Sequence, residues 1–533
     1  MAVVNELNPV PSAPRATGRF AWLRLSHSHT AFSATLLLMA STLLSGFLGL
    51  IRTRYINKIF GATPETDAYN AAFQLPDMLG YFLVGGVASI TLVTLLNRWR
   101  ERGDEEGADR ALSIVLNAMM LVLGGAIVLA EIFTPLYTRV AFPHFKPATE
   151  ALCNQLTRLM LPAQFFFFVG GVLNARLLVR KIFVYQAITP LIYNLGIIFG
   201  AVFLSSRFGI YSLAIGVMAG VIIGPGALTL YGVLRSGLRY QPIFNLRHPA
   251  FQEWLRLSFP LMIGVSLTYA DKWILAHYAS AEPGGISRLT VAKNLFNVPM
   301  SMIGSAAGAA SLPFFSSLFT QGKMWEFATG VNRAVSRVLS TALLASAWMV
   351  ALAFPIIDLF RGGAFKHQDA VETAQYFAIF SLSIAVWSAQ AIYSRSFYAA
   401  GNTMTPAIAG WAVTLVSIPL YAVLFHTLGV MGLALASGLG MTLSMLTLAM
   451  LLHKFRLVHI QGLEYAELGR ALVAALASYV GVAACLRWLQ LGRGYRGDVI
   501  AIAVGTIVWA ALSGGVLVGL GSKLPRQLLR RRG

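Results

Sequence analysis

Long apolar stretches are the feature that most limits what this chain can fold into. Residues of the types AVILMFWYC make up 57% of the 533 residues, whereas Asp, Glu, Lys and Arg together make up only 12%. A soluble domain carries about 25% charged residues, because its surface must be solvated. A membrane-spanning helix needs about 20 predominantly apolar residues, and the chain contains about fourteen stretches of this kind. The sequence therefore predicts an all-α polytopic membrane protein.

Two of the expected spans, the second and the eighth, are long and interrupted. Pro76 and Gly80 interrupt the second span, and Pro299 and Gly304 interrupt the eighth. Helix breaks at membrane depth are tolerated where protein or a wet cavity satisfies the freed backbone groups. We therefore expect both breaks beside protein or a cavity. The predicted spans are 31–51, 66–96, 111–134, 157–178, 186–205, 212–234, 255–279, 290–318, 336–359, 373–399, 405–427, 429–452, 468–490 and 499–521.

The charge balance indicates how the chain is oriented in the membrane. Lys and Arg number 41 against 21 Asp and Glu, which gives a net charge of +20. In a soluble protein this excess would suggest nucleic acid, but no nucleic-acid-binding signature is present, and basic residues concentrate in cytoplasmic loops of membrane proteins. Most of the Lys and Arg residues fall in segments that are cytoplasmic if the N-terminus is cytoplasmic. We therefore predict that both termini are cytoplasmic.

Internal similarity divides the chain into two related halves. The stretch 72–89 resembles 294–311, and the stretch 174–190 resembles 393–406 in the same order, each of the latter pair ending in Thr-Pro before a span. Internal repeats are common in transporters, whose substrate sites lie between the repeats. The predicted organisation is two six-helix lobes followed by two C-terminal helices. The expected segments are an N-terminal tail (1–29), an N-lobe (30–234), a C-lobe (235–453), spans 13 and 14 (454–522) and a basic tail (523–533).

Charged residues inside the spans mark where a substrate could bind, because ionisable groups at membrane depth usually face a cavity. Arg52 and Lys272 occupy comparable places in the two halves, and two facing cations would suit an anionic group such as a diphosphate. Another interpretation is that Arg52 and Arg54 extend to the membrane interface. Asp67 lies close to a helix start, where it could serve the helix N-terminus instead.

Neighbouring Asp271 and Lys272 need not pair with each other. On a helix, two consecutive side chains point about 100° apart, so each could meet a different partner. The two cysteines, Cys153 and Cys485, lie far apart and show no metal-ligand spacing. No metal site and no catalytic residue are expected.

Several segments together resemble the MurJ/MviN family of the MOP flippase superfamily, and the resemblance covers nearly the whole chain. It implies a transporter, not an enzyme, that flips lipid II, the undecaprenyl-diphosphate-linked peptidoglycan precursor, across the bacterial inner membrane by alternating access. It also implies two lobes around a cationic cavity and a groove at spans 13 and 14 for the prenyl tail. The segments are LGLIRTRYINKIFGATPETDAYNAAFQLPDML (48–79), ITPLIYNLG (188–196), ADKWILAHYAS (270–280), LFRGGAF (359–365) and SFYAAGNTMTPA (396–407).

The residues assigned to the site combine the resemblance with the charge pattern. Arg52, Lys272 and Lys293 are the expected diphosphate ligands. The expected cavity or gating residues are Asp67, Asp271, Arg54 and Asn294. The chain is a divergent member, because Gly46, Gly80 and Asn294 stand where the family usually has arginine. Lys293 replaces one of these basic residues at the adjacent position.

These departures leave several functions open. A flippase for another prenyl-linked oligosaccharide, of the O-antigen or exopolysaccharide type, is the main alternative. A cation-coupled exporter of the MATE type would need an acidic cavity, whereas the charges here are mainly basic. A membrane enzyme would need clustered carboxylates or large outer loops, and an inactive envelope-assembly scaffold would tolerate loss of Arg52. No cofactor is expected, the driving force is a membrane potential or an ion, and the partners are the lipid-linked glycan, membrane lipids and envelope-synthesis proteins.

Overall fold

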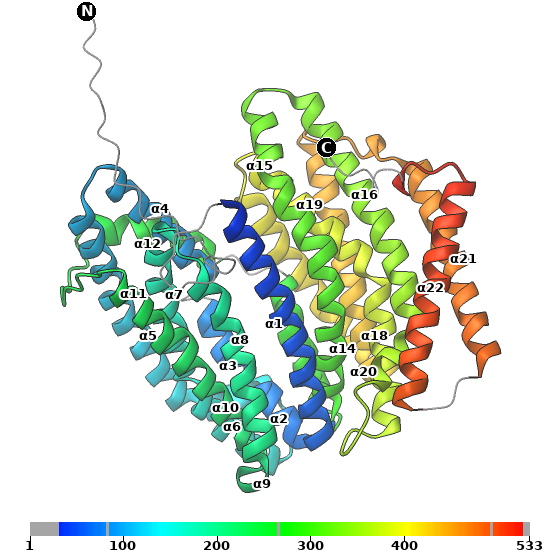
Figure 1. Cartoon of the computed structure of the whole chain (residues 1–533), viewed down its shortest axis with the longest axis horizontal. Coiled ribbons are helices and arrows are strands. Elements are labelled where there is room, and N and C mark those ends of the chain that lie inside the picture. The colour runs from blue at the N-terminus through cyan, green and yellow to red at the C-terminus, as the bar shows by residue number, and fades with distance from the viewer. Residues whose placement is uncertain (1–30, 82–84, 264–266, 491–493, 526–533) are drawn as a thin grey trace, which may run out of the picture.

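The computed structural model describes residues 31–81, 85–263, 267–490 and 494–525, and these residues are almost entirely helical (Figure 1). The pairing of Gly362 with Phe365 is the isolated β-bridge recorded in these ranges. The predicted all-α membrane fold is confirmed. The predicted N-terminal tail (1–29) and residues 526–533 of the basic tail lie outside the described ranges.

The helices coincide with the predicted apolar stretches, because a helix satisfies its backbone hydrogen bonds internally, as lipid requires. The first half contains α1 (Ala31–Phe60), α2 (Pro64–Ala72), α3 (Gln74–Leu79), α4 (Gly85–Glu101), α5 (Glu105–Ala141), α6 (Pro147–Met160), α7 (Ala163–Val179), α8 (Val184–Phe199), α9 (Ser205–Phe208), α10 (Tyr211–Val221) and α11 (Thr229–Arg235). The second half contains α12 (Pro249–Ile263), α13 (Leu267–Ala279), α14 (Gly285–Met300), α15 (Ala306–Thr320), α16 (Met324–Ala351), α17 (Ala353–Asp358), α18 (His367–Leu382), α19 (Ile384–Ala399), α20 (Met404–Lys454), α21 (Tyr465–Leu489) and α22 (Tyr495–Gly519).

Within the described residues, nine helical segments are long and apolar enough to cross a membrane, or ten if the bent pair α18 and α19 is one span. One of them, α20, covers two predicted spans and kinks at Gly429, where φ is 61° and ψ is −146°. The second, seventh and eighth predicted spans are divided into shorter helices. The total of fourteen spans therefore stays a prediction.

The two halves of the chain lie side by side, with α1 standing between them (Figure 1). Helix α1 packs against α8, while α21 and α22 pack against each other at the outer edge of the second half. Helix α12 packs against α4 and α5 of the first half, whereas α13 packs against α14 and α20. Helix α12, in the predicted C-lobe, thus packs against the first half, whereas α13 packs within the second half. The predicted lobe boundary at residue 235 stays a prediction.

The interruptions predicted in the second and eighth spans occur close to the residues that predicted them. Helix α3 ends at Leu79 with Gly80 as its C-terminal cap. Pro299 lies in the last turn of α14, and a π-helical turn at Ser301–Ser305 that contains Gly304 follows it. Irregular backbone at these points widens the helix, and it frees backbone N–H and C=O groups that would form hydrogen bonds within a straight helix.

The two Thr-Pro pairs, predicted to open their spans in the same way, differ in the structure. Pro406 lies in the first turn of α20, where its missing N–H costs no hydrogen bond. Pro190, by contrast, lies inside α8, which already begins at Val184. The expectation that Thr189 and Pro190 open the fifth span was therefore wrong, because the turn after α7 feeds directly into a helix that continues through the proline.

Candidate functional site

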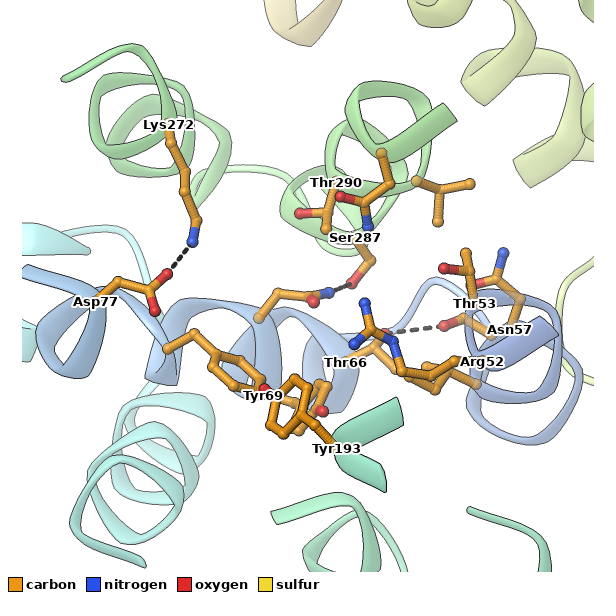
Figure 2. A pocket seen from close by; sticks show the side chains of 16 residues that line it. Arg52, Thr53, Asn57, Thr66, Tyr69, Asp77, Tyr193, Lys272, Ser287 and Thr290 are labelled. Atoms are coloured by element: carbon orange, nitrogen blue, oxygen red, sulfur yellow. Dashed lines mark hydrogen bonds and ion pairs between the residues drawn. The ribbon is translucent and has the colours of Figure 1, made fainter. Parts of the chain in front are cut away.

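A cavity of about 310 Å³ lies where α1, α2, α3, α8, α13 and α14 meet (Figure 2). Its walls come from both halves of the chain and carry mostly polar and aromatic side chains. The lining residues are Arg52, Thr53, Ile56, Asn57, Gly61, Thr66, Tyr69, Asn70, Phe73, Asp77, Tyr193, Lys272, Ser287, Thr290, Val291 and Asn294. Two of the three predicted diphosphate ligands, Arg52 and Lys272, therefore face one cavity.

Arg52 extends from α1 toward the side chains of α2 and α14 (Figure 2). Its side chain is half-buried, and it forms no ion pair or side-chain hydrogen bond with the residues that the structure describes. Asn70, Thr290 and Tyr193 line the same cavity and offer neutral hydrogen-bonding groups. An arginine without a carboxylate partner keeps its planar fork of donors available for a bidentate anion.

Lys272 forms an ion pair with Asp77 across the cavity (Figure 2). Lys272 lies on α13 in the second half, and Asp77 lies on α3 in the first half. The two side chains are 54% and 43% exposed, so water reaches both. The pair links the halves, and it neutralises one of the three cations that the sequence assigned to a diphosphate.

Lys293 lies in a second cavity of about 400 Å³, which shares Asn70, Lys272, Thr290 and Asn294 with the first. Its ammonium group is 2.8 Å from Asp271 Oδ2 and 3.1 Å from the Ser437 hydroxyl. Tyr421 donates a hydrogen bond to the other oxygen of Asp271.

Aromatic rings complete the surroundings of Lys293. Its nitrogen lies 4.3 Å from the ring centre of Trp387 and 4.4 Å from that of Phe380. Both distances fit cation–π contacts. The ammonium group is thus already balanced by Asp271 and enclosed by protein, in contrast to Arg52, although both were predicted to contact the substrate.

Asp67 is buried and serves the start of a helix in the opposite half. Its Oδ1 accepts hydrogen bonds from the backbone N–H of Ser287 at 2.8 Å and from the Ser287 hydroxyl at 2.7 Å. Its Oδ2 accepts one from the N–H of Gly284 at 2.5 Å. A carboxylate at a helix N-terminus satisfies free N–H groups and suits the helix dipole. Asp67 thus serves a helix N-terminus, but the helix is α14 in the other half and not the helix at whose start Asp67 itself lies.

The segment LFRGGAF reinforces the contact at this end of the cavity. The N–H of Ala364 donates to the carbonyl of Lys58 at the end of α1, at 2.9 Å. Gly363 has φ of 57°, and a Cβ there would lie 2.0 Å from the same carbonyl oxygen. Only glycine allows this approach. The two halves are therefore joined beside Gly61, which lines the cavity.

The remaining predicted residues lie in different places. Asn294 lines both cavities. Arg54 lines neither cavity and instead stacks over Tyr495 at the start of α22, 4.8 Å from the ring centre. At Gly80 an added Cβ would meet Gln164 at 2.7 Å, whereas Gly46 has open space around it. The Gln164 side chain from α7 thus fills the space beside Gly80.

Sequence reasoning assigned no role to Asp77, Asn70 or Tyr193. Asn70 donates to the Ser287 hydroxyl at 3.2 Å. The sequence offered no signal for the contacts of Asp77 and Asn70, because their partners, Lys272 and Ser287, lie in the other half of the chain. In the described part of the chain, no group of three or more His, Cys, Asp or Glu residues could hold a metal ion.

Comparison with known proteins identifies the family of this chain. The family model described as "Lipid II flippase MurJ" matches residues 56–505. The chain is 27% identical to the lipid II flippase MurJ of Burkholderia cenocepacia over 519 residues, which cover 92% of this chain and 98% of the relative. It is 26% identical over 410 residues to the probable lipid II flippase MurJ of Thermotoga maritima, covering 76% and 82% of the two chains.

Solved structures show the same fold. One described as lipid II flippase MurJ in an inward closed conformation superposes with a TM-score of 0.76 at 24% identity, covering 93% of this chain and all of that chain. An inward-facing transporter of the MATE family superposes with a TM-score of 0.66 at 16% identity, covering 80% and 98%. The family match extends over most of the chain and includes α2, α3, α13 and α14 of the cavity. The chain therefore belongs to the lipid II flippase MurJ family.

Proposed function

We propose that this protein moves lipid II from the cytoplasmic to the periplasmic leaflet of the bacterial inner membrane. The observation that carries the proposal is Arg52, an arginine without a carboxylate partner among the described residues, in a cavity between the two halves of a MurJ-family chain. The diphosphate of the substrate needs charge-assisted contacts to replace its lost hydration. Arg52 and Lys272 supply these contacts from opposite halves.

The transport cycle that we propose is alternating access without covalent chemistry. The N-lobe and C-lobe rock about the cavity, so that it opens first to the cytoplasm and then to the periplasm. Asp67 and the LFRGGAF segment join the halves at one end of the cavity, which supports a state that is closed there. With both termini cytoplasmic, α1 ends on the outer side, and that closed end is periplasmic.

The prenyl tail does not need the polar cavity. We assign it to α21 and α22, whose outward faces carry many exposed apolar side chains, among them Leu476, Val480, Ile507 and Val518. Such faces at the edge of the molecule can stay in contact with lipid while the headgroup moves. The contact of Arg54 with Tyr495 places the last part of α1 beside the start of α22.

The energy source is the membrane potential or a coupled ion, and we propose no cofactor. The potential acts on a net moving charge with about 2.3 kcal/mol per charge per 100 mV. The sign of the effect depends on the charge of the loaded complex, and the substrate diphosphate is anionic.

Transport of another prenyl-diphosphate glycan is the second proposal, and a specific observation favours it. The family resemblance implies arginine at the positions of Gly46, Gly80 and Asn294, and at Gly80 an added Cβ would lie 2.7 Å from the Gln164 side chain. A cavity with fewer cations has fewer charged groups with which to select a headgroup. The diphosphate is shared by both substrates, so the glycan decides between them.

Complementation tests the proposal directly. Cells depleted of their own lipid II flippase should grow when they express this chain and should lyse when they express the Arg52→Ala variant at the same level. Vesicle assays with fluorescent lipid II and with a fluorescent prenyl-diphosphate O-antigen unit then compare the substrates. Failure to rescue growth, together with transport only of the second lipid, would reject lipid II and support the other glycan.

A further inference from the structure

The ion pair between Lys272 and Asp77 has a consequence for how the cavity accepts its substrate. Each partner belongs to a different half of the chain, and both line the first cavity. Asp77 is the acidic residue among the side chains that line this cavity. With the pair formed, Arg52 is the cation in its wall that stays without a counter-ion among the described residues.

Among the described residues, the Asp77 carboxylate has no recorded hydrogen-bond partner other than Lys272. Helix α3, which carries Asp77, has only six residues and follows a break at Phe73. Asp67 differs, because it is buried with three backbone and hydroxyl donors. Asp77 can therefore leave its partner without exposing an unsatisfied buried group.

The exposure of the pair makes it exchangeable. Ion pairs that water reaches are weak, because solvent and dissolved ions compete for both partners. The Lys293–Asp271 pair shows the opposite case, since Asp271 is 1% exposed and the pair is surrounded by aromatic rings. An incoming diphosphate would therefore displace Asp77 from Lys272 long before it could displace Asp271 from Lys293.

We propose that Asp77 is a built-in competitor for the substrate: it occupies Lys272 in the empty cavity, and the anionic headgroup displaces it. Because the pair also joins the two halves, headgroup binding removes one of the contacts between them. Binding of the headgroup to Lys272 and loss of the Lys272–Asp77 contact between the halves are then the same event. This proposal rests on the proposed function, because it requires that the cavity accepts a diphosphate.

Two measurements on the full chain in detergent test the proposal. The first is the Kd of geranyl diphosphate, a water-soluble prenyl diphosphate, by thermophoresis. The second is the distance between spin labels at Arg102 and Gln321, which are exposed and follow α4 and α15 in the two halves. Cys153 and Cys485 are first replaced by alanine so that only the introduced cysteines are labelled.

Removing the competitor should strengthen binding and loosen the halves. Asp77→Asn should lower the Kd of geranyl diphosphate about tenfold. Without ligand, the distribution of distances between its two spin labels should already be as broad as in the ligand-bound wild type. Lys272→Ala should broaden the distances in the same way but raise the Kd about tenfold. Exchanging the two charges, in Asp77→Lys with Lys272→Asp, should restore the narrow distances, because the pair forms again. Glu65→Gln, which removes an exposed acid of the same half, should change neither quantity.

The outcomes separate the two proposals. If Asp77→Asn and the wild type bind geranyl diphosphate equally well, or the variant binds it more weakly, Asp77 does not compete with the substrate and this inference is overturned. If the ligand-free Asp77→Asn variant keeps the narrow distances of the wild type, the pair does not join the halves, and the inference is again overturned. If neither protein binds the diphosphate, the proposed function fails as well.

Discussion

At the scale of single residues, the cations in this membrane protein differ in their carboxylate partners. Arg52 faces the cavity without a carboxylate partner in the described part of the chain, Lys272 pairs with a water-exposed acid, and Lys293 pairs with a buried one. Charge alone made them equivalent in the sequence. Because Arg52 has no carboxylate partner among the described residues, an incoming anion can bind it without displacing an acid, whereas at Lys272 it must displace Asp77.

Replacing Arg52 tests this ranking. Each charge-assisted contact contributes roughly 1.5–3 kcal/mol, so Arg52→Ala should weaken diphosphate binding about ten- to a hundredfold and nearly abolish transport. Arg52→Lys should keep part of the activity, because the charge remains although the bidentate fork is lost. Transport of a fluorescent prenyl-diphosphate glycan in vesicles, at matched protein levels, measures both. Full activity of Arg52→Ala would mean that this side chain only extends to the membrane interface.

The buried pair should respond to mutation as a unit. Lys293→Met leaves Asp271 buried without its counter-ion, and breaking such a pair costs about 3–5 kcal/mol. The double variant Asp271→Asn with Lys293→Met removes both charges and should recover most of the lost thermal stability. Thermal unfolding of the purified proteins gives the comparison. A wild-type Tm in Lys293→Met alone would contradict the pairing, and transport by the double variant would show that Lys293 is not a substrate ligand.

At the scale of elements, the halves meet where loop backbone approaches helix ends. Asp67 satisfies the first N–H groups of α14, and the LFRGGAF segment lies on the end of α1. The first contact depends on the carboxylate of Asp67, whereas the second joins backbone groups of Ala364 and Lys58. They explain why two segments far apart in the sequence carry the family resemblance, since each forms one side of the same contact.

Gly363→Ala should weaken this contact. The left-handed backbone conformation costs about 1–2 kcal/mol for a residue with a Cβ, and the added Cβ would lie 2.0 Å from the Lys58 carbonyl oxygen. We expect a lower Tm and poorer yield of folded protein. Gly46→Ala is the matched control, because it lies within α1 with nothing within 4 Å. Alanine should leave that helix unchanged or slightly more stable, and equal losses in both variants would refute the close-approach argument.

At the scale of the whole molecule, the distribution of basic residues predicts orientation. Reporter fusions should place segments 97–110 and 454–467 in the cytoplasm, and segments 134–156 and 361–372 in the periplasm. The physical reason is that Lys and Arg are retained on the cytoplasmic side during insertion. A periplasmic reporter signal from 97–110 would reject the assignment of fourteen spans.

The sequence by itself determined the all-α membrane fold class and the breaks in the second and eighth spans. Apolar length and internal backbone hydrogen bonding leave a membrane-embedded chain almost no alternative to helices, and proline and glycine act locally. The Thr-Pro comparison failed at Pro190, because whether a proline opens a helix or lies inside it depends on where the preceding turn ends.

Only the tertiary structure decided which charges meet. Asp271 and Lys272 are neighbours in the sequence, yet one pairs with Lys293 and the other with Asp77. Consecutive side chains on a helix point about 100° apart, so their partners depend on the helices that pack on each side. Asp67 reaches a helix in the opposite half for the same reason. Pairing energies depend on distance and solvent exposure, and both arise only when the two halves of the chain come together.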